Sequence, residues 1–279
     1  MLLAGALAQL RADGPYESVT ASATWQDNVT NSAANDGIKG DLGLDTRSDL
    51  TWIRSLDFST LLTFTLSSDL SLSTNYSGLD NLGVGPAIEF RRKLGVGPFA
   101  PALYARLEGL AVGFQDPERS NISGALAFGY QQRLTDTLLV GVDARVGSYD
   151  ARDIVFTGDY ASVASRLCWD MSEVWRLKLS AGWRTGDGVS NFTAYKGPYG
   201  WAPVDEGADN LPGAWHYVST FRQPYVAYLV SARTWSYGFG ISPAVGRHTA
   251  LSLDFAHTDS QAGLSYIDNI ISLSVVHQF

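Results

Sequence analysis

The clearest pattern of apolar and polar positions lies at the end of the chain. Residues 267–279 read I-D-N-I-I-S-L-S-V-V-H-Q-F. Alternate residues counted back from the end form one mostly apolar set and one mostly small or polar set. A period of two is typical of a β-strand whose two faces meet different environments. The apolar set is Phe279, His277, Val275, Leu273 and Ile271, and the other is Gln278, Val276, Ser274, Ser272 and Ile270.

The same alternation recurs in about eleven earlier segments, which are separated by turns rich in Gly, Pro, Asn and Asp. In residues 58–72 the parity of the apolar positions survives the S-S-D sequence, which favours one long strand over a hairpin. We therefore predict about twelve strands, with ten or fourteen as alternatives because the pattern is weakest before Leu61 and after Thr220. The expected strands are residues 19–26, 38–49, 58–72, 84–93, 99–114, 126–131, 140–146, 161–169, 175–184, 225–243, 251–255 and 267–279.

The last strand resembles the terminal strand of bacterial outer-membrane β-barrel proteins, porin-like in the broad sense. In those proteins a C-terminal Phe, here Phe279, helps the assembly machinery recognise the chain, and the usual aromatic residue two positions earlier is His277 here. The resemblance implies an all-β protein of the outer membrane, folded as a closed antiparallel up-and-down transmembrane barrel. Closure also follows from physics, because an open sheet edge in lipid would leave backbone donors and acceptors unpaired.

The connections between the expected strands alternate in length. The turns T-D-T, D-M-S-E and V-G-R-H are short, whereas the intervening loops are longer and polar. Short periplasmic turns and long extracellular loops are typical of transmembrane barrels. An even number of strands would then place both termini on the periplasmic side.

The composition fits this class. Charged residues make up only 17% of the chain and aromatic residues 12%, and no stretch beyond the N-terminus approaches 18 apolar residues. Transmembrane barrels have such a composition because their apolar residues occupy alternate positions. A soluble β-sandwich or lectin-like protein is the alternative. The net charge of −8 argues against a nucleic-acid partner, and the single Cys168 excludes an internal disulfide framework or a cysteine-cluster metal site.

The N-terminus reads M-L-L-A-G-A-L-A, a short apolar run that ends in the small-x-small motif Ala6-Leu7-Ala8. This arrangement is typical of the end of a secretory signal peptide. We therefore expect residues 1–8 to be a truncated signal peptide, and residues 9–279 to form a single barrel domain.

If the apolar positions face lipid, the other parity lines the lumen. It places acids on the second and eleventh strands and bases on the fourth, fifth, eighth and ninth, which predicts opposed walls and a transverse field that would orient polar solutes. Pairing of these charges across adjacent strands in a filled lumen is the structural alternative. The basic wall comprises Arg91, Arg106, Arg166, Arg176, Lys178 and Arg184, and the acidic wall comprises Asp41, Asp45, Asp49 and Asp254.

Residues 187–220 interrupt the alternation, and we expect a long extracellular loop there. Long loops without a pattern are usually functional or disordered, and the aromatic content of this one argues against plain disorder. Folded inward it would constrict or plug the pore, and folded outward it would form a binding surface. Its candidate constriction residues are Tyr195, Tyr199, Trp201, Asp205, Glu206 and Trp215.

The sequence offers little enzyme chemistry. Outer-membrane phospholipases need a Ser, a His and a polar orienting residue on the outer wall, but H-T-D-S around His257 lacks their His-x-Ser spacing. Omptin-type proteases need carboxylates and an Asp–His pair at the rim, for which His257 with Asp259, or His216 with Asp205 and Asp209, are weak candidates.

No cofactor or metal site is expected. The turn residue His248 and His277 on the last strand have no metal-ligand neighbours in the sequence pattern. Residues 205–210 read D-E-G-A-D-N and offer several oxygens for calcium, but they lack the EF-hand spacing, so an ordinary acidic loop is favoured.

Together these features predict a passive outer-membrane channel for small polar or charged solutes, in contact with outer-membrane lipid and lipopolysaccharide. The alternatives are a non-conducting structural or binding barrel, which could belong to a larger envelope assembly with a protein partner, and a membrane-embedded hydrolase.

Overall fold

The computed structural model describes residues 15–33, 37–197, 200–203, 215–218, 220–221, 225–262 and 264–279. Twelve long strands form a closed antiparallel up-and-down barrel, as predicted. They are β1 (Tyr16–Gln26), β2 (Asp41–Ser55), β3 (Thr60–Ser73), β4 (Asn81–Lys93), β5 (Ala102–Phe114), β6 (Asn121–Arg133), β7 (Leu138–Ala151), β8 (Gly158–Asp170), β9 (Trp175–Gly197), β12 (Tyr225–Pro243), β13 (Thr249–Ala262) and β14 (Leu264–Gln278). The strand expected over 58–72 is indeed one strand rather than a hairpin, but it begins at Thr60, and Phe58 lies in the turn before it.

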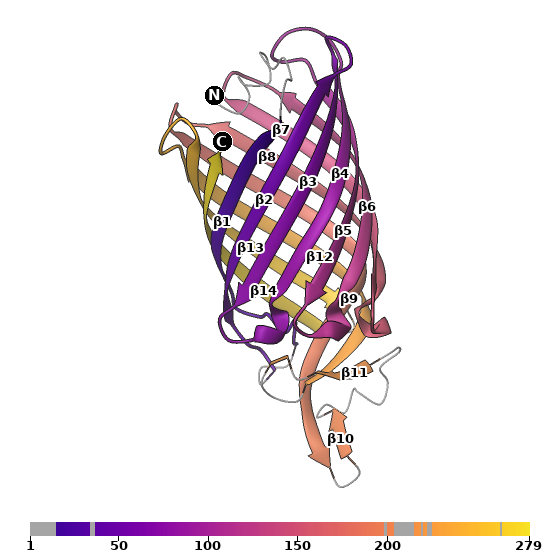
Figure 1. Ribbon diagram of the computed structural model, residues 1–279. Helices are drawn as coiled ribbons and strands as arrows, with labels where there is room; N and C mark the ends of the chain where they lie inside the picture. The colour runs from indigo at the N-terminus through magenta and orange to yellow at the C-terminus, as the bar shows by residue number, and fades with distance from the viewer. Residues whose placement is uncertain are drawn as a thin grey trace.

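Each strand pairs with its neighbours in sequence, and two further pairings close the ring (Figure 1). β9 pairs with β12, and β1 pairs with β14. The backbone N–H of Phe279 donates to the carbonyl of Glu17 at 2.9 Å, which extends the seam to the last residue. β1 therefore begins, and β14 ends, at one end of the barrel, here called the terminal end.

The opposite end, here called the loop end, carries short 3-10 helices in the described connections between strands. They are η2 (Ser77–Leu79), η3 (Pro117–Arg119) and η4 (Ile154–Phe156). At the terminal end, the connections between β2 and β3 and between β8 and β9 are tight turns. The alternation of short and long connections that the sequence shows thus corresponds to the two ends of the barrel.

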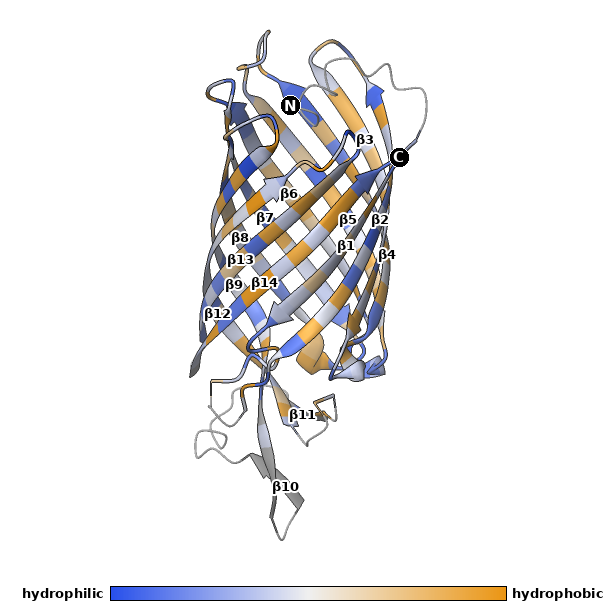
Figure 2. Cartoon of the chain, turned by 90° about the vertical axis from the view of Figure 1, so that its left-hand side faces the viewer, coloured by the Kyte–Doolittle hydropathy of each residue, from blue (hydrophilic) through white to orange (hydrophobic). Residues whose placement is uncertain are grey.

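Large apolar side chains cover the outside of the barrel. Leu107, Phe128, Phe239 and Leu273 lie on different strands, and each is more than half exposed. Apolar and polar residues alternate along the strands (Figure 2). An apolar surface that surrounds a protein is a surface for lipid rather than for water. Strands of 13 residues or more, such as β4 and β6, exceed the roughly 9–11 residues that a tilted strand needs to cross a bilayer. Within the described residues no helix has the length and apolar character to span a membrane.

The segment without a sequence pattern begins as a strand. β9 continues to Gly197, and its half nearer the loop end pairs with β12 as far as Thr193 opposite Tyr225. β9 then turns back through the short β10 (Gly200–Pro203), and this hairpin projects beyond the loop end (Figure 1). The short β11 (Trp215–Val218) pairs with the start of β12. Part of residues 187–220 is therefore an extension of the barrel wall.

Candidate functional site: the charged lumen and its cap

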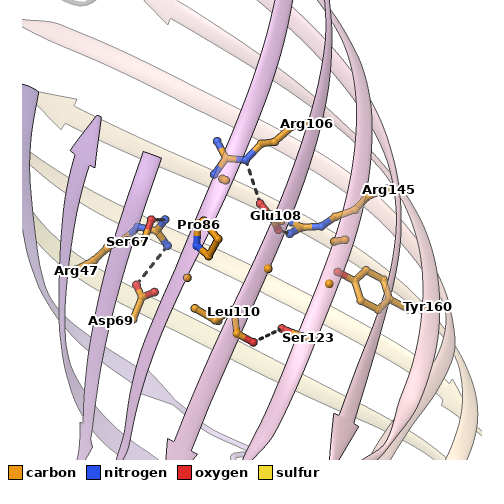
Figure 3. Close-up of a pocket in the computed structure, with 15 residues that line it drawn as sticks. Arg47, Ser67, Asp69, Pro86, Arg106, Glu108, Leu110, Ser123, Arg145 and Tyr160 are labelled. Carbon is orange, nitrogen blue, oxygen red and sulfur yellow. Dashed lines mark hydrogen bonds and ion pairs between the residues drawn. The ribbon is translucent and has the colours of Figure 1, made fainter. Parts of the chain in front are cut away.

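Charged side chains line one wall of the lumen, from β2 to β7. They occupy the positions between the outward-facing apolar residues, so that Arg106 and Glu108 alternate with Leu107 on β5. In Figure 3, Arg47, Arg106, Glu108 and Arg145 converge from several strands around one cavity. The parity of the sequence thus places these charges on the inner surface.

Glu108 is the central member of a chain of ion pairs that crosses this wall. Its Oε2 accepts from Arg106 Nε at 3.0 Å, and its other carboxylate oxygen contacts Arg145 of β7. Arg106 also lies 4.0 Å from Glu89 of β4, which binds Arg91 at 2.9 Å. We call the residues Glu89, Arg91, Arg106, Glu108 and Arg145 the ladder. Because each charged side chain in the ladder has an oppositely charged neighbour, the wall contains many charged side chains but has little net charge.

Beside the ladder, a second group of ion pairs joins β2 to β3. Arg47 Nε lies 3.0 Å from Asp49, and its Nη1 lies 3.3 Å from Asp69. Between Arg47 and the ladder is a cavity of about 150 Å³, which Tyr160 closes on the β8 side. This volume is well below the roughly 300–1,000 Å³ of a drug-sized ligand pocket, so it suits water, ions or a small polar solute.

Three of the four predicted acidic-wall residues lie on β2 and are held by neighbouring polar groups. Asp41 is nearly buried and accepts from the backbone N–H of Asn75 at 3.1 Å. Asp45 accepts from Ser71 Oγ at 2.5 Å, and Asp49 accepts from Arg47. Asp41 and Asp45 thus serve mainly to join β2 to the loop and strand beside it.

The fourth acid, Asp254, binds a predicted member of the basic wall. Lys178 Nζ lies 2.6 Å from Asp254 Oδ1 across β12. The residue between them is Gly240, whose missing side chain leaves room for both groups. This pair joins the two predicted walls instead of opposing them, which is the cross-strand pairing that the sequence left as an alternative.

The other basic-wall residues have varied partners. Arg176 Nε binds Asp170 at 2.5 Å near the terminal end, and Arg184 stacks over Tyr160 at 4.5 Å from the ring centroid. Arg166 packs against Gly141. Among the described residues, neither Arg166 nor Arg184 has an ion pair with a carboxylate, so these two carry positive charge that remains available to a solute.

The ring of Tyr104 fills the space beside Gly129, where a Cβ atom would overlap it. We predict that Gly129→Ala lowers the free energy of unfolding by about 1–3 kcal/mol, because the ring must move within a packed lumen. The matched control is Gly246→Ala, at a turn position with no atom within 4 Å, for which we expect a change below about 0.5 kcal/mol. Urea unfolding in detergent micelles measures both, and equal effects would contradict the packing argument.

The loop end of the lumen is covered by an apolar cluster, here called the cap. Its buried members come from η4, from Val218 and Phe221 and from the start of β12, and the β1–β2 loop and η2 contribute further contacts. The β1–β2 and β7–β8 loops lie half the ring apart, so a cluster that includes both must extend across the mouth. The buried members are Val155, Phe156, Val218, Phe221, Tyr225 and Ala227, and the half-buried ones include Val29, Tyr76 and Leu79.

Hydrogen bonds across the mouth hold the cap in place. Tyr225 Oη donates to the carbonyl of Gly37 at 3.1 Å, and Thr220 Oγ1 donates to Asp116 beside η3 at 2.7 Å. Asn191 of β9 donates to the carbonyl of Thr30 at 2.7 Å. The described residues Val218, Thr220 and Phe221 thus lie over the mouth, beside the start of β12, while the β9–β10 hairpin projects away from it.

The guanidinium of Arg119 packs against two rings of the cap, Phe156 and Phe221, and is largely shielded from solvent. Its guanidinium lies 4.5 Å from the Phe156 ring centroid and 3.5 Å from Asp116. Burial lowers the pKa of this guanidinium, and the nearby Asp116 opposes the shift. An arginine nevertheless stays charged near neutral pH. The cap is therefore an apolar layer with one partly shielded ion pair packed against it.

No protein-family model matches the sequence, and no curated protein does either. Solved structures are nevertheless similar. An outer membrane channel from Pseudomonas putida F1 superposes with a TM-score of 0.56 at 12% identity, over 96% of this chain and 97% of that one. The NanC porin superposes with a TM-score of 0.50 at 8% identity, over 94% of this chain and all of the other. This chain has the fold of bacterial outer-membrane β-barrels.

At these identities the similarity concerns the fold alone, and the resemblance predicted from the last strand is confirmed at that level. In this outer-membrane barrel fold, Phe279 extends the seam between β14 and β1, and its ring lies 4.5 Å from that of His277. The proposed recognition of Phe279 during assembly stays a prediction.

The side chains of the predicted constriction residues all lie outside the described part of the chain. Tyr199, Asp205 and Glu206 lie outside the described residues. The backbones of Tyr195, Trp201 and Trp215 belong to β9, β10 and β11, but their side chains lie outside the described part of the chain. The cap residues Val155, Phe156, Phe221 and Tyr225 were not predicted, although three of them are aromatic residues in or beside loops of an otherwise polar composition.

The hydrolase candidates do not form a catalytic group. His257 Nδ1 lies 2.8 Å from Asn269 Oδ1 and contacts no serine among the hydrogen bonds of the described residues. Ser260 is fully buried on the other face of β13, where its hydroxyl bonds Thr234 at 2.9 Å. His216 has carboxylates beside it, but the described ones are Glu118 and Asp153, while Asp205 and Asp209 lie outside the described residues.

Proposed function

We propose that this protein is an outer-membrane channel through which small polar or charged solutes pass passively. The observation that carries the proposal is a charged inner wall with a cavity of about 150 Å³, enclosed by a barrel with an apolar exterior. The terminal end would face the periplasm and the loop end the outside. Outer-membrane lipid and lipopolysaccharide would surround the apolar belt.

A lumen of paired charges suits this role. The ladder and the Arg47 group offer donors and acceptors on one surface, so a solute or ion can exchange water for protein groups as it passes. Because the charges neutralise one another, neither sign is strongly excluded. Arg166 and Arg184 add an uncompensated positive side on β8 and β9, which would favour anionic solutes there.

The cap would act as the gate of the channel. It covers the loop end with apolar side chains. A layer of this kind blocks ions because an ion that enters it loses its hydration water and gains no polar partner in return. Solute passage would therefore require Val218, Thr220 and Phe221 to move away from the mouth. Such a movement would break the hydrogen bond from Thr220 to Asp116 and the apolar contacts of Phe221, while the ladder between β9 and β12 stays intact.

Conductance in planar bilayers tests the proposal. In a variant with residues 194–224 replaced by Asn-Gly, a two-residue turn joins Thr193 to Tyr225, which already face each other in the β9–β12 register. We expect rare openings for the full chain and long-lived openings for the variant. Refolding is verified by the heat-dependent shift of the band in SDS gels, and heat-denatured protein is the control. A refolded variant that conducts no current would rule out the channel.

A second function, a non-conducting binding or structural barrel, is favoured by the closed cap and by the projecting β9–β10 hairpin. The hairpin would then contact an envelope protein partner, and the lumen charges would serve stability. Copurification from native membranes with the intact chain, lost when residues 194–224 are replaced by Asn-Gly, would support this role. A membrane-embedded hydrolase has less support because Ser260 and His257 lie on opposite faces of β13. We propose no cofactor for either function.

A further inference from the structure

Three side chains from separate connections meet beside the cap. His216 of β11 has its Nε2 at 2.6 Å from Glu118 Oε2 of η3, and its Nδ1 at 3.1 Å from Asp153 Oδ2. One donor atom from each residue lies within 4.8 Å of the other two. The three side chains are partly exposed, so the group is accessible from solution.

The backbone holds the two acidic residues side by side. The N–H of Asp153 donates to the carbonyl of Glu118 at 3.3 Å, and the N–H of Arg152 donates to that of Ser120 at 3.2 Å. These bonds join the β5–β6 connection to the β7–β8 connection. Asp153 Oδ1 also accepts from the N–H of Val155 at 2.9 Å, which leaves Oδ2 directed at His216. The Asp153 carboxylate is therefore preorganised, and the backbone of Glu118 is fixed beside it.

The charge around this group is unbalanced. Among the described residues, His216 is the only basic side chain with an ion pair to Glu118 or Asp153. The neighbouring Arg119 points into the cap, where it lies against Asp116 and Phe156. Two carboxylates thus flank one imidazole without a permanent positive charge among them, which a cation would supply.

We propose that Glu118, Asp153 and His216 form a binding site for a divalent transition metal of the Zn²⁺ type. One imidazole nitrogen and two carboxylate oxygens are ligands that such ions accept, with water completing the coordination. Metal–ligand distances of about 2.0–2.2 Å place neighbouring donors roughly 3.3–3.6 Å apart, so small side-chain rotations from the present positions suffice. The imidazole nitrogen disfavours Ca²⁺, which prefers all-oxygen sites.

A metal here would connect three parts of the chain. η3 and the residue before η4 belong to the barrel loops, whereas His216 belongs to the segment that leads through Val218 and Phe221 into the cap. A bound ion would therefore fasten this segment over the mouth. Binding itself does not depend on the proposed channel function, because it can be measured without any conductance.

Titration of the refolded full chain with ZnCl₂ at pH 7.5, after removal of metals with EDTA, tests the site. Calorimetry should show one saturable site, and Glu118→Gln, Asp153→Asn and His216→Ala should each weaken it by about tenfold or more. The matched control is His248→Ala in an exposed turn at the terminal end, which should bind like the unchanged chain. CaCl₂ should bind at least about tenfold more weakly than ZnCl₂.

A second readout avoids reliance on the variants. Co²⁺ added to the unchanged chain should give visible absorption bands of a low-symmetry site, and stoichiometric Zn²⁺ should abolish them. The proposal is overturned if the unchanged chain shows no saturable binding or no such bands. It is equally overturned if refolded His216→Ala binds Zn²⁺ as tightly as the His248→Ala control.

Discussion

Glu108→Gln is expected to shift the selectivity of the open pore toward anions. The substitution keeps the shape of the side chain but removes the carboxylate that Arg106 and Arg145 share. Both guanidiniums then lose their closest negative partner, while the rest of the ladder stays in place. The lumen gains one net positive charge at its most heavily charged wall.

The size of the shift follows from Coulomb's law. A unit charge about 6 Å from a passing ion changes its energy by roughly 0.7 kcal/mol in a water-like dielectric, which is about threefold in local concentration. The effect has opposite sign for Cl⁻ and K⁺, so their permeability ratio should change by about three- to tenfold, with the lower value at high salt. Reversal potentials in a KCl gradient, recorded in the variant with residues 194–224 replaced, measure this ratio.

The ladder supplies its own controls. Arg145→Gln removes the opposite charge and should shift selectivity toward cations by a similar factor, and the double variant with Glu108→Gln should return near the starting value. Glu173→Gln makes the same chemical change in an exposed turn at the terminal end and should leave the ratio nearly unchanged. If Glu108→Gln and Glu173→Gln give the same reversal potential, the ladder does not line the conduction path.

Much of the barrel could be predicted because each wall residue faces one of only two environments, the outside of the barrel or the lumen. Leu70 and Leu72 face outward while Ser71 bonds Asp45 inside, so every strand repeats one simple pattern. The half of β9 nearer the loop end was not predicted as a strand, for a local reason. Gly186 has a φ of 139°, and a side chain there would collide with the backbone of β8. The strand thus continues through a G-D-G sequence that normally marks a turn.

The partners within the lumen and the cap could not be predicted from parity. Whether Lys178 meets Asp254 depends on the register of two strand pairs and on Gly240 between them. His216 meets Glu118 and Asp153 across long stretches of chain whose approach depends on how the loops fold over the mouth. The opposed walls were inferred without these contacts, and Lys178 and Asp254 show why pairing reduces the field between them.

Phe221→Asp is expected to open the channel without deletion of any segment. Phe221 is only 2% exposed, and its ring lies 5.4 Å from that of Tyr76 and 5.1 Å from that of Tyr225. Loss of a buried phenyl group costs about 3–5 kcal/mol, and a carboxylate in the apolar cluster adds a desolvation cost. The cost falls on the closed state because an open cap exposes the aspartate to water.

A change of about 3 kcal/mol corresponds to roughly a hundredfold rise in the ratio of open to closed channels, since 1.4 kcal/mol is a factor of ten. Single-channel recordings of the full-length variant measure it. The cap is a local unit, so the unfolding midpoint of the barrel should change little. Phe58→Asp is the matched control, because Phe58 is 91% exposed in a turn at the terminal end and the same substitution there touches no cluster. Equal open probabilities for these two variants would mean that the cap does not gate the pore, whereas a rise confined to Phe221→Asp would identify the aromatic cluster as the closed gate.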